Sequence, residues 1–170
     1  ASLIKWFVNV SFDRYSNLTD FAVSAGTFDR RFLSVGRQPT HVVVGAGLWD
    51  AQSRPPSEFA KYLPILITSL KRLFPSAHIV WLTAPPIDAS QLKGRHYRTN
   101  EYLATISRIA KATLAGEESV TLVDGFGIVS AVRRTSTDGR HYPASTCLDI
   151  ANILWNLVLP PEGEVSGVDR

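Results

Sequence analysis

Short apolar runs alternate with stretches of helical periodicity along this chain. Four runs have the β-branched and aromatic content of strands, at residues 2–10, 40–45, 77–83 and 119–123. Between and after them, apolar residues recur at helical spacing over residues 57–73, 99–114 and 144–159. Ser57 is expected to be the N-cap of the first of these helices, and Leu148, Leu154 and Trp155 lie among the apolar positions of the last. This alternation predicts a three-layer α/β domain with a mostly parallel sheet.

The length and composition fit one globular domain. The chain has 170 residues, of which 45% are hydrophobic and 19% charged, so it can bury a sizeable core and is not globally disordered. We expect the domain to occupy residues 1–159 and residues 160–170 to form a polar tail or linker. Because no apolar run approaches the ~20 residues that a bilayer crossing needs, no transmembrane helix is expected. The chain begins at Ala1 and has no methionine, which indicates a processed product or a fragment.

Charge and cysteine content narrow the classes of partner and cofactor. The formal net charge of +3 is spread along the chain, with tight basic doublets at residues 30–31 and 133–134, so a nucleic-acid partner is not expected. The single cysteine, Cys147, excludes a disulfide within the chain, and we expect it to be a buried thiol. The histidines, at positions 41, 78, 96 and 141, show no metal-ligand spacing. We therefore expect neither a metal nor a cofactor.

Loops at the carboxyl ends of parallel strands build the sites of such domains. Here these loops are residues 45–50, 84–92 and 124–143. The Gly-Ala-Gly at residues 45–47 suggests a dinucleotide fingerprint, but the third glycine should fall at position 50, which is Asp. A nucleotide-binding domain is therefore disfavoured.

The segment Asp-Gly-Arg-His at residues 138–141 carries the strongest catalytic signal. An Asp three residues before a His lets the carboxylate of Asp138 reach the imidazole Nδ1–H of His141. The second ring nitrogen could then act as a general base toward a hydroxyl group. The alternative is a solvated turn, in which Asp138 caps the chain and His141 packs on Tyr142.

A second candidate is the Gly-Leu-Trp-Asp segment at residues 47–50. Gly47 could let backbone N–H groups face an oxyanion, and Trp49 could form a wall of a sugar or acyl pocket. The alternative is structural, with Trp49 in the core and Asp50 as a turn or cap residue. Asn100, near the start of the helix at 99–114, is expected to be a cap or packing residue.

Taken in order, these pieces resemble an SGNH (GDSL-like) hydrolase domain of the PC-esterase branch, and in particular the lumenal domain of sialate and fungal-capsule O-acetyltransferases. The likeness covers nearly all of residues 3–158 in order and with similar spacing. The matching segments are residues 4–8, His-Val-Val-Val-Gly-Ala-Gly-Leu-Trp-Asp at 41–50, Val-Trp-Leu at 80–82 with the prolines at 85–86, Thr-Asn-Glu at 99–101, and Asp-Gly-Arg-His at 138–141.

The resemblance implies a Ser-His-Asp triad, with Asp138 as its aspartate, His141 as its general base, and Gly47 and Trp49 near the oxyanion hole. Two departures stand out. Trp49 occupies a position where SGNH enzymes usually have an oxyanion-donating Asn, and no Asp-Ser dipeptide occurs in the 170 residues. The run at residues 2–10 matches the family's second strand. We therefore expect the flavodoxin-like sheet to lack its first, nucleophile-bearing strand and the serine to lie upstream of Ala1.

The resemblance thus implies a serine esterase or O-acetyltransferase acting on O-acetyl groups of glycans. Its partners would be a glycan or other O-acylated substrate and, for a transferase, an acyl donor, with a membrane domain elsewhere in the full protein. The family likeness and the sequons at Asn9 and Asn17 point to the secretory pathway, in the Golgi lumen or outside the cell. The alternative is a catalytically inactive SGNH-like module that binds glycan or a protein partner.

Overall fold

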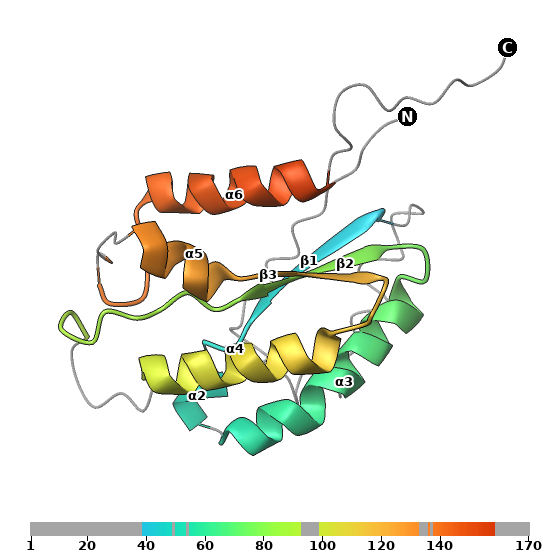
Figure 1. The fold of residues 1–170 in the computed structure, drawn as a ribbon, viewed down its shortest axis with the longest axis horizontal. Helices are drawn as coiled ribbons and strands as arrows, with labels where there is room; N and C mark the ends of the chain where they lie inside the picture. The colour runs from blue at the N-terminus through green and yellow to red at the C-terminus, as the bar shows by residue number, and fades with distance from the viewer. Residues whose placement is uncertain are drawn as a thin grey trace, which may run out of the picture.

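The part of the fold that the structure describes is built on three parallel strands with helices on both faces (Figure 1). The structure is a computed structural model that describes residues 39–48, 50–53, 55–92, 99–132, 136 and 138–158. The described elements follow one another as β1 (His41–Ala46), α2 (Asp50–Ser53), α3 (Pro56–Leu73), β2 (His78–Thr83), α4 (Asn100–Leu114), β3 (Val120–Val123), α5 (Gly125–Val132) and α6 (Ala144–Val158). This sequence of elements confirms the α/β prediction.

The described sheet has the order β1-β2-β3, with both pairs parallel. His41 lies opposite His78 at the start of β1 and β2, and Ile79 lies opposite Val120 where β3 begins. Because both pairs are parallel, the three described strands point the same way and their carboxyl ends meet at one edge. β1 lies at one side of the described sheet. The predicted strand at residues 2–10, and its pairing with β1, lie outside the described residues.

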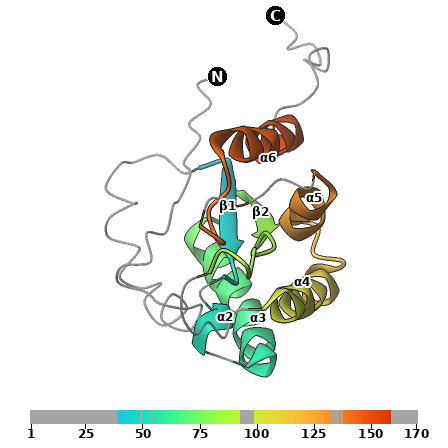
Figure 2. The ribbon, with the colours of Figure 1, turned by 90° about the vertical axis from the view of Figure 1, so that its left-hand side faces the viewer.

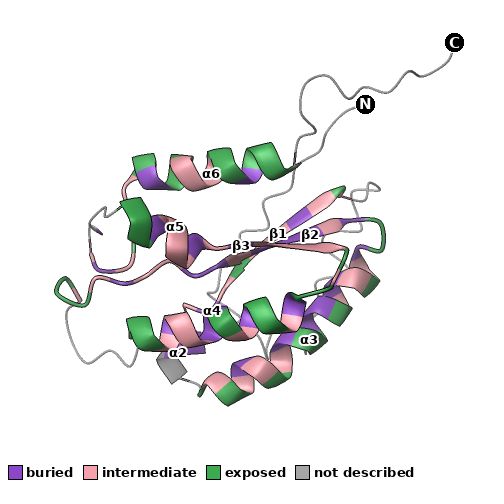
Figure 3. Ribbon diagram, viewed as in Figure 1, coloured by how far each residue is buried: buried purple, intermediate pink, exposed green. Residues whose placement is uncertain are grey.

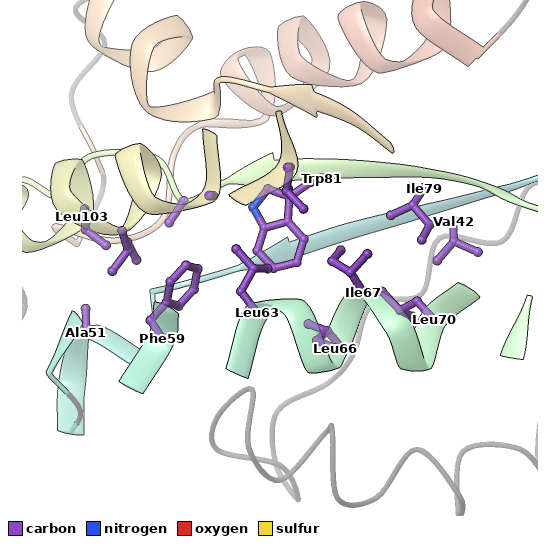
Figure 4. Close-up of a cluster of buried hydrophobic side chains, with 14 of the residues drawn as sticks. Val42, Ala51, Phe59, Leu63, Leu66, Ile67, Leu70, Ile79, Trp81 and Leu103 are labelled. Carbon is purple, nitrogen blue, oxygen red and sulfur yellow. The ribbon is translucent and has the colours of Figure 1, made fainter. Parts of the chain in front are cut away.

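The larger core lies between the sheet and helices α3 and α4. Alternate side chains of a strand point to opposite faces, and Ile79 and Trp81 of β2 point toward these helices. Figure 4 shows Trp81 beside Leu63 of α3, with Phe59 of the same helix in the same cluster. The rings of Phe59 and Trp81 meet nearly edge to face, with centroids 6.4 Å apart. Such aromatic pairs contribute about 0.5–1.5 kcal/mol beyond the area that they bury.

The smaller core lies on the opposite face, beneath α5 and α6. It contains Val80 of β2, Val123 of β3 and Leu154 of α6. Figure 2 shows α6 on one side of the sheet and α2, α3 and α4 on the other. The molecule therefore has the three layers that the alternating pattern predicted. No helix among the described residues is long and apolar enough to span a bilayer.

The structure corrects several local predictions. Ser57 is not an N-cap, because α3 already begins at Pro56 and extended Pro55 takes the N-cap position without a side-chain hydrogen bond. Proline suits the first helical position, since its fixed φ is helical and no N–H partner is needed there. Within the segment 124–143, expected to be a loop, residues 125–132 form α5.

The last helix is also more exposed than its apolar sequence suggested. Leu154 is buried, but Leu148, Trp155 and Leu157 are 61%, 49% and 51% exposed, and α6 is largely coloured as exposed in Figure 3. Cys147, expected to be a buried thiol, lies in the first turn of α6 and is exposed as well.

Candidate active site

Asp138 and His141 form a hydrogen-bonded pair in the loop before α6. Oδ2 of Asp138 lies 2.7 Å from Nδ1 of His141. Oδ1 of the same carboxylate accepts the backbone N–H groups of Arg140, at 2.9 Å, and His141, at 2.8 Å. The carboxylate therefore fixes both the backbone turn and the imidazole ring, as the spacing of three residues predicted.

The environment of Asp138 keeps its carboxyl group ionised. The backbone N–H of His141, the backbone N–H of Arg140 and the His141 ring together hold the pKa of Asp138 far below its usual range. Because an ionised carboxylate can only accept hydrogen bonds, the shared proton belongs to Nδ1 of His141. In the neutral imidazole this leaves the basic lone pair on Nε2, which is the arrangement that a general base needs.

The pair is open to solvent. The side chain of His141 is 76% exposed and that of Asp138 43% exposed. An accessible imidazole can meet a hydroxyl group from a substrate or from another segment. The same exposure means that packing of the ring contributes little to its position, so the surrounding loop must hold it.

The loop that carries His141 is held by hydrogen bonds on both sides of this residue. The buried Ser136 donates its hydroxyl to the carbonyl of His141, at 2.7 Å. The carbonyl of Gly139 accepts the N–H of Asp88, at 3.0 Å, and the Tyr142 hydroxyl donates to the carbonyl of Pro86, at 2.7 Å. The loop after β2 therefore supports the loop before α6, although about fifty residues separate them in sequence.

The Tyr142 hydroxyl is kept protonated by its surroundings. Burial, reinforced by the negative charge of Asp88, raises the pKa of Tyr142 above its ordinary value. A protonated phenol can donate to the Pro86 carbonyl, and a phenolate cannot. The raised pKa therefore extends the contact between the two loops to more alkaline pH than an ordinary tyrosine would allow.

Asn100 has a different role from the cap or packing residue that was expected. The N-cap of α4 is Thr99, whose hydroxyl accepts the N–H of Tyr102, at 3.0 Å. The side-chain amide of Asn100 instead binds the backbone of Ile87 twice, accepting its N–H at 2.7 Å and donating to its carbonyl at 2.9 Å. Asn100 thus fixes the loop after β2 to the start of α4.

Gly47 lies directly after β1, at the same edge of the sheet. Its φ of +112° is one that L side chains rarely adopt, and a Cβ there would lie 2.5 Å from Cδ1 of Ile106. Its carbonyl accepts the N–H of Ala51, at 3.0 Å. These contacts with α2 and α4 explain why glycine is needed at this turn.

Of the other predicted site residues, the structure joins Asp138 to His141, whereas Trp49 lies outside the described residues.

Asp124 is a second carboxylate at this edge, and it has a structural role at the N-terminus of α5. It accepts the Lys111 ammonium at 2.6 Å, the Gly127 N–H at 3.0 Å and the Thr83 hydroxyl at 3.3 Å. Partial burial acts to raise its pKa, but these hydrogen bonds and the charge of Lys111 outweigh burial and lower the pKa. Asp124 therefore caps α5, a role that its position directly after a strand could have suggested.

No group of three metal-ligating side chains occurs within the part of the chain that the structure describes.

Comparison with solved structures identifies the fold. A lipase/acylhydrolase from Enterococcus faecalis is 17% identical, covers 83% of this chain and 70% of its own, and superposes with a TM-score of 0.61. An α/β hydrolase from the metagenome of Lake Arreo, Spain, is 19% identical over 81% of this chain and 66% of its own, with a TM-score of 0.52. A peptidoglycan O-acetylesterase is 15% identical over 85% of this chain and 41% of its own, also with a TM-score of 0.52.

These similarities show that the chain has the flavodoxin-like α/β fold that these solved structures share. No protein-family profile and no curated protein matches the sequence.

Proposed function

We propose that this chain supplies the His and Asp of a serine esterase or O-acyltransferase that acts on O-acetyl groups of glycans. The observation that carries the proposal is the Asp138–His141 pair, with its 2.7 Å hydrogen bond and its ionised carboxylate. Two structures of the same fold support this reaction class, since one is a lipase/acylhydrolase and another is a peptidoglycan O-acetylesterase.

In the proposed reaction His141 acts first as a base and then as an acid. Nε2 of His141 takes the proton of a serine hydroxyl as its oxygen attacks the acetyl carbonyl carbon. The C–O bond to the glycan then breaks, and the imidazolium returns the proton to the leaving glycan oxygen. The acetyl group remains on the serine as an ester. Asp138 stabilises the imidazolium and keeps Nδ1 protonated throughout.

The second half of the reaction decides between hydrolysis and transfer. His141 takes a proton from water or from an acceptor hydroxyl, which then attacks the acetyl-serine and regenerates the serine. Water yields acetate, and a glycan hydroxyl yields a new acetyl ester. A transferase would also need an acyl donor, and we propose that a membrane domain elsewhere in the full protein accompanies that role.

The serine and the oxyanion donors complete the proposed site. No Asp-Ser dipeptide occurs in the chain, and β1 lies at one side of the described sheet, so we propose an upstream strand that carries the serine. Gly47 and Trp49 are proposed to line the oxyanion hole and substrate pocket, since Gly47 follows β1 at the edge that also carries His141 and Trp49 is two residues further along the chain. An indole N–H cannot take the place of an Asn amide in the same way, so we propose that backbone N–H groups act as the oxyanion donors. The proposed location is the secretory pathway.

Site-directed variants test the proposal. In a chain extended through its native upstream sequence, His141→Ala should lower kcat for acetyl-ester hydrolysis by about 10⁴-fold or more. Asp138→Asn should cost as much or less, because it misorients the base without removing it. His41→Ala is the matched control, since His41 begins β1 at the opposite edge of the sheet, and it should leave kcat unchanged.

Two results would contradict the proposal. Full activity of His141→Ala would remove His141 from the reaction. Absence of hydrolysis and of transfer in the extended wild-type chain, with glycan or protein binding retained, would identify a non-catalytic module instead.

A further inference from the structure

The segment 86–88 lies between α4 and the loop that carries His141. Its central residue, Ile87, has both backbone polar groups bound to the side chain of Asn100. The flanking polar groups point the other way, since the Pro86 carbonyl accepts the Tyr142 hydroxyl and the Asp88 N–H donates to the Gly139 carbonyl. One short segment therefore connects the start of α4 to the site.

Asn100 is the side chain that holds this segment from the side of the helix. Its two hydrogen bonds, at 2.7 and 2.9 Å, match the donor and acceptor of one residue, as a neighbouring strand would. The helix does not need this amide, because Thr99 provides the N-cap. The contact also fixes the buried Ile87 side chain, which is part of the larger core.

The contacts on the far side of the segment flank His141 closely. Gly139 lies two residues before His141 and Tyr142 directly after it. Because the His141 ring is 76% exposed, its place depends on the backbone of this loop more than on packing of the ring. A shift of residues 86–88 would therefore move the imidazole.

We propose that Asn100 is a positioning residue for His141 and acts through the segment 86–88. This inference rests on the proposed function, in which His141 is the general base. Since a displacement of about 1 Å can cost about 10²-fold in rate, an anchor well away from the reacting atoms can still control turnover.

The kinetic test compares two neighbouring residues of α4. Asn100→Ala removes both bonds to Ile87 and should lower kcat by about tenfold to a hundredfold with little change in KM. Thr99→Ala removes the helix cap, leaves the Ile87 contacts intact and should leave kcat nearly unchanged. Asn100→Asp keeps an acceptor for the Ile87 N–H but sets a carboxylate oxygen against the Ile87 carbonyl, so its kcat should fall at least as far as that of Asn100→Ala.

Equal losses of kcat in Asn100→Ala and Thr99→Ala would overturn the proposal, because both would then act only through the stability of α4. Unchanged kcat in Asn100→Ala would overturn it as well. If Asn100→Ala fails to fold, Asn100→Asp decides: a lowered kcat supports the proposal, and an unchanged kcat overturns it.

A second measurement does not depend on activity. Nitrogen-15 NMR of the ring of His141 reports which ring nitrogen carries the proton in the neutral imidazole. Wild type and Thr99→Ala should show the proton on Nδ1, held by Asp138. Asn100→Ala should show a mixture with the Nε2–H form, and a spectrum identical to wild type would contradict the positioning role. If wild type lacks esterase activity but the ring responds in this way, the proposed function fails while the positioning role stands.

Discussion

Gly139 lies where the two loops of the site come closest. Its φ is +87°, and a Cβ on this residue would lie 2.7 Å from both the carbonyl oxygen of Asp88 and Cδ2 of Leu92. Any side chain there would push apart the segments that hold His141. Glycine is therefore required at this position both for its backbone conformation and for its lack of a Cβ.

A pair of glycine variants separates these two requirements. Gly116 has a nearly equal φ of +86°, but no atom lies within 4 Å of where its Cβ would stand. Gly116→Ala should therefore lower the free energy of unfolding by about 1–2 kcal/mol through backbone strain alone. Gly139→Ala should cost clearly more, because steric overlap adds to the strain. Denaturant unfolding of both variants measures the difference, and equal losses would show that the close approach has no energetic effect.

At the residue scale, the sequence predicted the Asp138–His141 pair but not the hydrogen bonds that hold the surrounding loop. The three-residue spacing of Asp138 and His141 lets a local turn bring them together, so local geometry was sufficient to predict their contact. The role of Asn100 could not be predicted in this way, because its partner Ile87 is reached only when β2 and α4 pack together.

At the scale of elements, the contact between the loop after β2 and the loop before α6 includes one titratable donor. Tyr142 must be protonated to donate to the Pro86 carbonyl, and burial raises its pKa. A raised pKa in the folded state stabilises the fold at pH values below the ordinary tyrosine pKa. This contribution is lost as the pH rises through the raised value.

An alkaline titration tests this dependence. The absorbance of tyrosinate should show a component that ionises above the ordinary range in wild type, and the contribution of Tyr142 to it should be missing in Tyr142→Phe. The stability difference between wild type and Tyr142→Phe should also shrink as Tyr142 ionises. Titration of Tyr142 in its ordinary range would contradict the buried contact.

The predicted elements that proved correct have a strong period and clear boundaries. β1, β2, β3, α3 and α4 begin and end within a residue of their predicted bounds, because turns, prolines or Thr99 delimit them. α5 was not predicted because its sequence has two glycines and no polar stripe. That sequence is Gly-Phe-Gly-Ile-Val-Ser-Ala-Val. Its start depends on Asp124, which accepts the Gly127 N–H and is held in place by Lys111 and Thr83 of other elements.

At the scale of the whole molecule, the three parallel strands of the described residues bring the loops after β1 and β2 and the loop before α6 to one edge. The alternation of strands and helices was enough to predict this layered arrangement. The exposure of Leu148 and Trp155 on α6 was not predictable, since burial depends on which elements cover a helix and not on its own sequence. The contacts that hold the His141 loop were not predictable for the same reason, since they also depend on how distant elements pack together.

Labelling with a fluorophosphonate probe, which reacts with activated serines, tests the central claim most directly. The chain extended through its native upstream sequence should be labelled on an upstream serine, and His141→Ala should abolish the labelling. The 170-residue chain alone should remain unlabelled. Labelling of the 170-residue chain, labelling of the extended chain that survives His141→Ala, or no labelling of either chain would contradict a triad formed by Asp138, His141 and an upstream serine.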